Sequence, residues 1–156
     1  PTAIVHFLGG AFVATAPQVT YRRLLERLAL QGYAIVATPF VNTFDHEQIA
    51  QTVLRNFERA ILRLEDTAFR NRYLPIYGIG HSMGCKLHLL IGSRFQVERS
   101  GNILIAFNNY SAREAVPLVE QFASIVSQVA PNLSVEFTPS PVETNQIVAE
   151  NYQVRR

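Results

Sequence analysis

The stretch that decides the fold is LPIYGIGHSMGCKLHLLI, residues 74–91. It begins with a short apolar run typical of a buried strand and ends with a run that is typical of a helix. Between them, Gly80-His81-Ser82-Met83-Gly84 matches the Gly-x-Ser-x-Gly pattern of a nucleophile elbow, a sharp turn that exposes a serine. The glycines leave room for this turn, because side chains there would collide with the neighbouring strand and helix. The pattern therefore predicts Ser82 as a nucleophile.

Backbone N–H groups near this serine are expected to bind the negative oxygen that forms when a serine attacks a carbonyl. One is the N–H of Met83, because the turn stands at the N-terminus of the following helix. A second is expected in the loop after the first strand, where a glycine pair follows an apolar run. Either Gly10 or Ala11 would supply it. The alternative is a plain glycine turn between a strand and a helix.

Strand and helix patterns alternate along the chain. Apolar runs typical of strands occupy residues 2–8, 33–38, 74–80 and 102–107, with a shorter alternating run at 133–137. Helical patterns occupy residues 17–31, 49–64, 83–95, 112–129 and 141–152. Asp45 is expected to cap the second helix, with Gln48 three residues later. This alternation predicts βαβ units, a mostly parallel sheet and right-handed crossovers in one α/β domain over residues 1–156.

Composition limits the classes of partner. Hydrophobic residues make up 48% and charged residues 17% of the 156 residues, which suits a globular domain with a sizeable core. The net charge is only +2 and the cations are scattered, so no nucleic-acid partner is predicted. No apolar run reaches the ~20 residues of a membrane-spanning helix. Cys85 is the only cysteine, so no internal disulfide can form and a reducing compartment is expected.

Four stretches resemble the domain-of-unknown-function 1350 family of cyanobacteria and plants: residues 6–12, 43–46, 80–89 and 101–113. The segment Phe107-Asn108-Asn109-Tyr110-Ser111 is the most distinctive, and the resemblance covers nearly the whole chain. It implies an α/β-hydrolase-like three-layer sandwich, of which this chain would lack the C-terminal strands. It also implies a link to photosynthetic organisms, with the protein in a cyanobacterial cytoplasm or a plant plastid.

The acid and the base of a catalytic triad are expected outside this chain. In α/β-hydrolases the triad follows the order serine, acid, histidine. After the serine the sequence has no aspartate and one histidine, His88, which lies on the same helix and points away from the serine. The later glutamates considered for the acid, none of which directly follows a buried parallel strand, are Glu114, Glu120, Glu136, Glu143 and Glu150. The resemblance therefore implies a triad acid and histidine beyond Arg156.

The other reactive side chains have plainer explanations. His81 is expected to pack against the far side of the turn, and His6 is kept as an alternative base near the glycine loop. Asp45-His46 could form a relay pair, but a capping aspartate with a solvated neighbour is favoured. Cys85 is expected to be a small buried residue rather than a nucleophile.

A substrate pocket is expected at the carboxyl ends of the strands, where open parallel sheets bind ligands. Its candidate residues are Phe12, His81, Asn108, Asn109 and Tyr110. Helix capping by Asn109 or Ser111 is an equal alternative for that segment. Residues 122–152 are expected to form a cap or lid over the pocket.

The sequence thus predicts a serine hydrolase acting on a small ester or thioester, with a lipid or isoprenoid ester as one option. No metal and no cofactor are expected, and residues 1–156 alone should be nearly inactive. The alternative is a non-catalytic module of the same fold that binds a ligand or a partner, since fold does not determine function. A third option is an assembly protein of photosynthetic membranes.

Overall fold

A four-stranded sheet forms the centre of the computed structural model, which describes residues 1–43, 45–69 and 72–107. The strands are β1 (Ala3–Leu8), β2 (Tyr33–Ala37), β3 (Ile76–His81) and β4 (Gly101–Ile105). Their order is β2-β1-β3-β4, and every neighbouring pair is parallel. All the described residues belong to one compact unit, residues 1–107. The predicted α/β fold with a parallel sheet is confirmed for this part of the chain.

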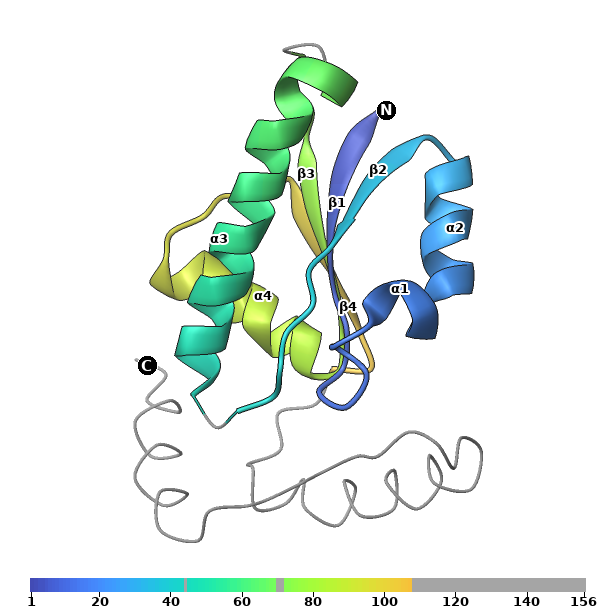
Figure 1. The fold of residues 1–156 in the computed structure, drawn as a ribbon. Coiled ribbons are helices and arrows are strands. Elements are labelled where there is room, and N and C mark those ends of the chain that lie inside the picture. Colours follow the sequence, from blue (N-terminus) through green and yellow to red (C-terminus); the bar gives the residue numbers. More distant parts are fainter. Residues whose placement is uncertain (44, 70–71, 108–156) are drawn as a thin grey trace, which may run out of the picture. The chain divides into compact units, whose positions relative to one another are not determined.

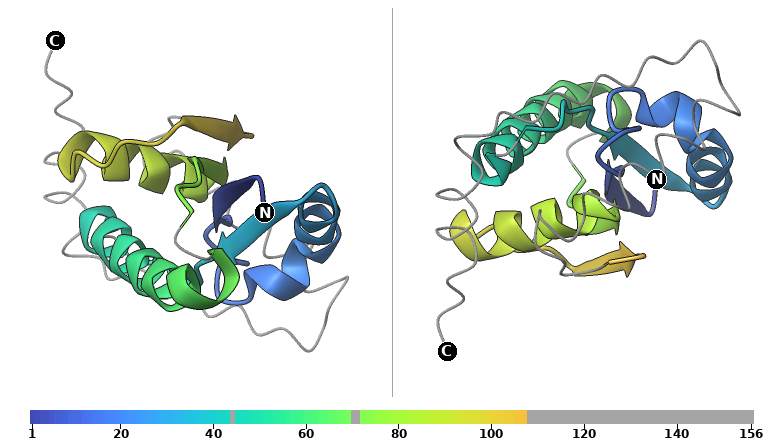
Figure 2. Two further views of the ribbon diagram at one scale, coloured as in Figure 1. Left: turned by 90° about the horizontal axis from the view of Figure 1, so that it is seen from above. Right: turned by 90° about the horizontal axis from the view of Figure 1, so that it is seen from below.

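Helices cover both faces of the sheet. Between β1 and β2, α1 (Pro17–Thr20) and α2 (Arg22–Leu30) cover one face. On the other face lie α3 (His46–Leu64) and α4 (Met83–Arg94), as Figure 1 and Figure 2 show. A turn of π-helix, Glu65–Phe69, continues α3. The described part therefore has three layers, helix, sheet and helix.

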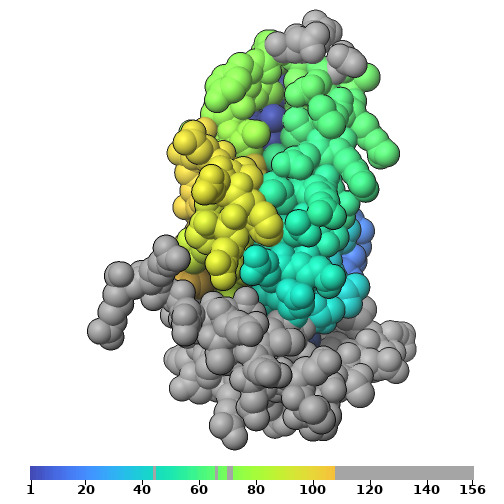
Figure 3. All heavy atoms as spheres, turned by 90° about the vertical axis from the view of Figure 1, so that its left-hand side faces the viewer, coloured from blue at the N-terminus to red at the C-terminus, as the bar shows by residue number. Residues whose placement is uncertain are grey.

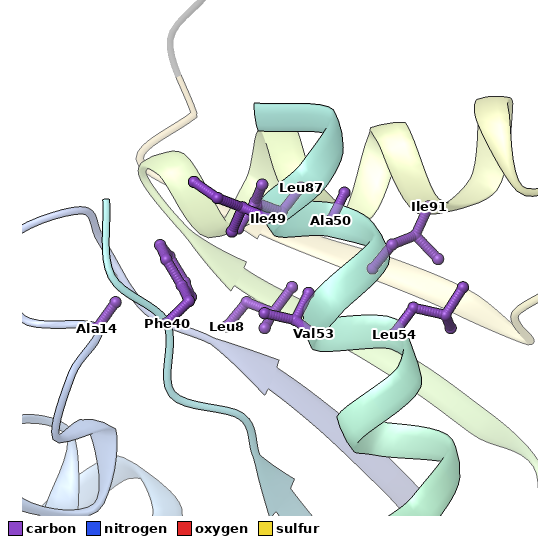
Figure 4. Close-up of a cluster of buried hydrophobic side chains, with 9 residues drawn as sticks. All are labelled: Leu8, Ala14, Phe40, Ile49, Ala50, Val53, Leu54, Leu87 and Ile91. Carbon is purple, nitrogen blue, oxygen red and sulfur yellow. The ribbon is translucent and has the colours of Figure 1, made fainter. Parts of the chain in front are cut away.

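Alternate residues of β1 face opposite layers, as the geometry of a strand requires. Val5 and Phe7 pack with Leu25 of α2. Leu8 packs on the other face, in a cluster of nine buried residues from β1, α3, α4 and two loops (Figure 4). Figure 3 shows the outer surface of this second layer, where α3 and α4 lie side by side. The central strand is thus buried on both faces.

The cap predicted for α3 is present. The Gln48 N–H donates to Oδ1 of Asp45 at 2.8 Å. We expect Asp45→Ala to lower the free energy of unfolding by about 1 kcal/mol, because one N–H at the start of the helix loses its acceptor. Asp45→Asn, which keeps an oxygen at this place, should lose much less in the same urea titration. An equal loss in both variants would contradict the cap.

One predicted helix is divided in two. Residues 17–31 were expected to be continuous, but the helix breaks at Tyr21, which ends α1 and begins α2 with φ −104° and ψ 17°. The break places the Tyr21 ring on Phe7 of β1, with ring centroids 4.8 Å apart. The prediction was wrong here because the apolar spacing on either side of Tyr21 continues through the break.

The fourth strand ends two residues earlier than predicted. Ala106 has φ 51°, a left-handed conformation that cannot continue a strand, so β4 stops at Ile105. The elements predicted for residues 112–129, 133–137 and 141–152, and the cap predicted for residues 122–152, lie outside the described residues. Among the described helices, none is both long enough and apolar enough to span a membrane.

Candidate active site

Ser82 occupies the turn between β3 and α4, with φ 52° and ψ −115°. Residues other than glycine rarely adopt this backbone conformation. The Ser82 N–H donates to the Ile105 carbonyl of β4 at 2.9 Å. Its hydroxyl makes no capping hydrogen bond to α4. The fold therefore holds the serine in a strained turn without using its hydroxyl to cap the helix.

The two glycines of the motif are packed too closely to carry side chains. A Cβ at Gly80 would lie 2.5 Å from the backbone nitrogen of Cys85, a distance that real Cβ atoms do not show. A Cβ at Gly84 would collide with the carbonyl oxygen of Leu8 at the end of β1. This agrees with the steric role that the sequence predicts for both glycines. The start of α4 can approach β1 only because they are glycines.

The turn lies where the strand order of the sheet reverses direction. From β1 the chain moves to β2 on one side, and β3 then pairs with β1 on the other. Leu8 and Gly80 are paired at the carboxyl ends of these two strands. Such a reversal is where open parallel sheets bind ligands. The loop after β1 also comes next to the serine, because a Cβ at Gly10 would lie 3.5 Å from the Ser82 Cβ.

The glycine loop, residues 9–12 after β1, has only one of its two predicted donors free of a hydrogen bond to the described residues. The Gly10 N–H is engaged, because it donates to the Tyr21 hydroxyl at 2.8 Å. The N–H of Ala11 has no acceptor among the described residues. At the first position of α4, the N–H of Met83 cannot reach a carbonyl of its own helix. Met83 and Ala11 are therefore the donors that could bind an oxyanion without breaking an existing bond.

His81 is hydrogen-bonded to a residue that the sequence pattern does not indicate. Its Nδ1 lies 2.9 Å from the hydroxyl of Tyr21, 60 positions earlier in the chain. Burial lowers the pKa of His81 and raises the pKa of Tyr21, so both side chains are neutral at pH 7. The sequence predicts packing for His81, and the structure adds this hydrogen bond. No local signal could have found it, because the two residues come together only through the pairing of β1 with β3.

His6 lies in the core, under α3, and not at the turn. Its ring is fully buried and stacks on Phe57, with centroids 4.1 Å apart. Nδ1 lies 3.0 Å from Nη2 of Arg99 and must accept, because a guanidinium can only donate. Nε2 therefore carries the hydrogen and donates to Oγ1 of Thr38 at 3.0 Å. With both ring nitrogens engaged, His6 has none left to act as the alternative base.

His88 belongs to the same buried cluster. Its ring meets that of His6 edge to face at 5.1 Å, which agrees with the expectation that it points away from the serine. Neither ring nitrogen has a hydrogen-bond partner of good geometry. Burial, helped by the nearby charge of Arg99, lowers the pKa of His88 to about 4 and outweighs the opposing backbone groups of Ile79 and His6. The pKa of His6 falls well below its usual value for the same main reason.

His46 and Cys85 are held in the fold by burial, and neither is hydrogen-bonded to the Ser82 hydroxyl. His46, predicted to be a solvated neighbour of Asp45, is instead half-buried. Burial, and then the charge of Lys86, lower its pKa to about 4 against the opposing charge of Asp45. Cys85 is buried, and its thiol donates to the carbonyls of Gly80 at 3.1 Å and Ile105 at 3.3 Å. Burial raises the pKa of this thiol. Cys85 is therefore the small buried residue that the sequence predicts.

The other candidates are divided between the described and undescribed parts of the chain. Phe12 lies half-buried in the glycine loop, next to Ala11. Asn108, Asn109, Tyr110 and the five later glutamates lie outside the described residues and stay predictions. Within residues 1–43, 45–69 and 72–107, no group of three or more His, Cys, Asp or Glu side chains could hold a metal ion.

Comparison with known proteins identifies a family for the chain. A family model with the description "Protein of unknown function (DUF1350)" matches residues 1–156. The match includes both the glycine loop and the turn at Ser82. No curated protein matches the chain.

Proposed function

The chain belongs to the DUF1350 family, and we propose from its own residues that it is a serine hydrolase acting on an ester or thioester. Ser82 would attack the carbonyl carbon of the substrate. The N–H groups of Met83 and Ala11 would bind the oxygen that becomes negative. The observation that carries the proposal is the backbone conformation of Ser82, φ 52° and ψ −115°, at the carboxyl end of β3.

A strained serine at this place calls for a reason beyond stability. A non-glycine residue in such a conformation costs on the order of 1–3 kcal/mol. A serine that served only to cap α4 would adopt a relaxed conformation and accept a hydrogen bond from the helix. Ser82 makes no such bond. A nucleophile benefits from the strain, because the turn lifts the hydroxyl to the edge of the sheet beside the oxyanion donors.

Acyl transfer is the reaction class that uses these groups together. The hydroxyl would lose its proton to a base as its oxygen bonds to the carbonyl carbon, and the carbonyl oxygen would become negative. The C–O or C–S bond would then break, with the proton passing to the leaving alcohol or thiol. Water would release the acid from the acyl-serine and restore the hydroxyl. Phe12, which the sequence predicts for the substrate pocket, would favour an apolar, lipid-like acyl group.

The base would have to come from outside the printed sequence. All four histidines of the sequence lie in the described residues, and none of their ring nitrogens bonds to the Ser82 hydroxyl. The proposal therefore includes a triad acid and histidine supplied by residues beyond Arg156. It also includes a location in a cyanobacterial cytoplasm or a plant plastid, which the family resemblance implies.

Labelling with a fluorophosphonate probe tests the proposal without knowledge of the substrate. We expect the full-length protein to be labelled on Ser82 and Ser82→Ala to be unlabelled, because phosphonylation requires an activated serine. Ser93→Ala is a matched control, since the Ser93 hydroxyl donates to Leu89 within α4 and should not matter. Mass spectrometry of the labelled peptide identifies the site. Resistance of the folded full-length protein, or equal labelling of Ser82→Ala, would falsify the proposal.

The alternative is a module of the same fold that binds a ligand or a partner without catalysis. One observation favours it: no described histidine is hydrogen-bonded to the Ser82 hydroxyl. In that case the folded protein would resist the probe, and Ser82→Ala would bind its ligand as the wild type does. The same labelling experiment therefore separates the two functions.

A further inference from the structure

We propose that Tyr21 is a positioning residue of the Ser82 site, which ties the glycine loop after β1 to the end of β3. This inference rests on the proposed hydrolase function. The Tyr21 hydroxyl accepts the Gly10 N–H at 2.8 Å and lies 2.9 Å from Nδ1 of His81. His81 is the residue directly before Ser82. One oxygen atom thus joins the loop that would bind the oxyanion to the turn that carries the nucleophile.

The direction of these hydrogen bonds follows from the donors present. The Gly10 N–H can only donate, so the Tyr21 oxygen accepts there and has its own hydrogen left to give. That hydrogen goes to Nδ1 of His81, the atom within reach. His81 is then neutral and carries its proton on Nε2. Protonation of His81 would remove this acceptor, because both ring nitrogens would become donors.

The Tyr21 ring is fitted closely against the loop. A Cβ at Gly9 would lie 2.7 Å from Cε2 of Tyr21, so only glycine leaves room for the ring. A Cβ at Gly10 would lie 3.2 Å from Nδ1 of His81, 3.4 Å from the Tyr21 oxygen and 3.5 Å from the Ser82 Cβ. The hydroxyl, the imidazole and the serine therefore surround one point of the loop. A shift of the loop would change its distance from Ser82 directly.

The break between α1 and α2 occurs at the residue that joins the loop to the turn. A continuous helix over residues 17–31 was expected, but the chain breaks at Tyr21, the residue whose hydroxyl makes both contacts. The Gly10 N–H is bound to Tyr21. The next N–H along the loop, that of Ala11, is therefore the one that would donate to the oxyanion. The orientation of Ala11 then depends on the Tyr21 hydroxyl.

Tyr21→Phe removes the hydroxyl and keeps the ring. We expect the rate of fluorophosphonate labelling of Ser82 to fall about tenfold or more, because loss of an oxyanion donor costs about a hundredfold and misplacement costs part of that. Tyr33→Phe is the matched control, since its hydroxyl on β2 makes no hydrogen bond to the described residues. A second variant, His81→Leu, leaves Tyr21 and the helix break intact. It should slow labelling less, because Gly10 keeps its acceptor.

Histidine-ring nuclear magnetic resonance gives a readout that a purely structural role would not move. In the wild type we expect the Nε2–H tautomer of His81. In Tyr21→Phe its pKa should rise, because a hydrogen bond to the neutral ring is lost. Labelling of Tyr21→Phe at the wild-type rate, or an Nδ1–H tautomer in the wild type, would overturn the role of Tyr21 and leave the hydrolase proposal standing. Failure of the folded wild type to label would overturn both.

Discussion

Gly84→Ala is expected to lower the free energy of unfolding more than any other single substitution considered for this fold. The new methyl group would collide with the carbonyl oxygen of Leu8, and both sides of this contact are backbone. Relief requires α4 to move away from β1, which disturbs the cluster around Leu8 and Leu87. Overpacking of a core costs about 1–3 kcal/mol even where side chains can adjust. We therefore expect a loss of about 3 kcal/mol or more, a large part of the 5–15 kcal/mol that typically stabilises a domain.

Gly92→Ala is the matched control for this experiment. Gly92 lies in the same helix, and a Cβ there would meet nothing within 4 Å. The substitution should raise the free energy of unfolding by about 0.5–1 kcal/mol, because alanine favours a helix more than glycine does. Urea denaturation followed by circular dichroism measures both variants. If Gly84→Ala were as stable as Gly92→Ala, the close approach of α4 to β1 would be disproved.

Acidification from pH 7 to pH 5 is expected to destabilise the fold strongly. His6 and His88 are neutral in the folded protein because burial lowers the pKa of each below the value of 6.5 in an unfolded chain. Below pH 6.5 the unfolded chain therefore binds more protons than the folded one. The stability is complete above pH 6.5 and is lost as the pH falls toward 4. For His88, with a pKa of about 4, the loss by pH 5 is about 2 kcal/mol.

The surroundings of this cluster offer little compensation for the added charge. Arg99 faces both histidines, its own pKa is lowered to about 10 by burial, and Glu58 is the carboxylate that opposes this shift. In His88→Leu, the number of protons taken up on unfolding near pH 5 should fall by about one, so the free energy of unfolding should depend less steeply on pH. The substitution should not weaken the fold at pH 7, because it removes two buried nitrogens without partners. The pKa of His46 is also lowered to about 4, so His46 should add to the loss of stability in acid. Its share is measured separately with His46→Gln. An unchanged pH dependence in His88→Leu would show that folding does not lower the pKa of His88.

Local sequence patterns predicted the features that depend on neighbouring residues. The strand, turn and helix around Ser82 follow from apolar runs and paired glycines within eighteen residues of sequence. The cap at Asp45 depends on a residue three positions away. These arrangements are formed by short-range sterics and hydrogen bonds, which is why a single sequence reveals them.

Contacts between distant residues could not be predicted in the same way. The bond between Arg99 and His6 joins residues 93 positions apart, and it requires β1 and the segment before β4 to be placed by the sheet. The break at Tyr21 leaves the apolar spacing intact, so only the partners of its hydroxyl explain it. The engagement of Gly10, which leaves Ala11 as the loop's free donor, follows from the same distant contact.

The central position of β1 and β3 in the described sheet has a practical consequence for protein engineering. Both strands are paired on two sides, so the distance between the glycine loop and Ser82 is fixed by their mutual pairing. The outer strands β2 and β4 end at the same edge of the sheet, but neither the glycine loop nor Ser82 follows them directly. Residues 41–43, which follow the buried Phe40 after β2, are therefore a site where insertions or grafted loops could change which molecules reach the serine. Residues 9–12 and 80–84 should be left unaltered in such libraries.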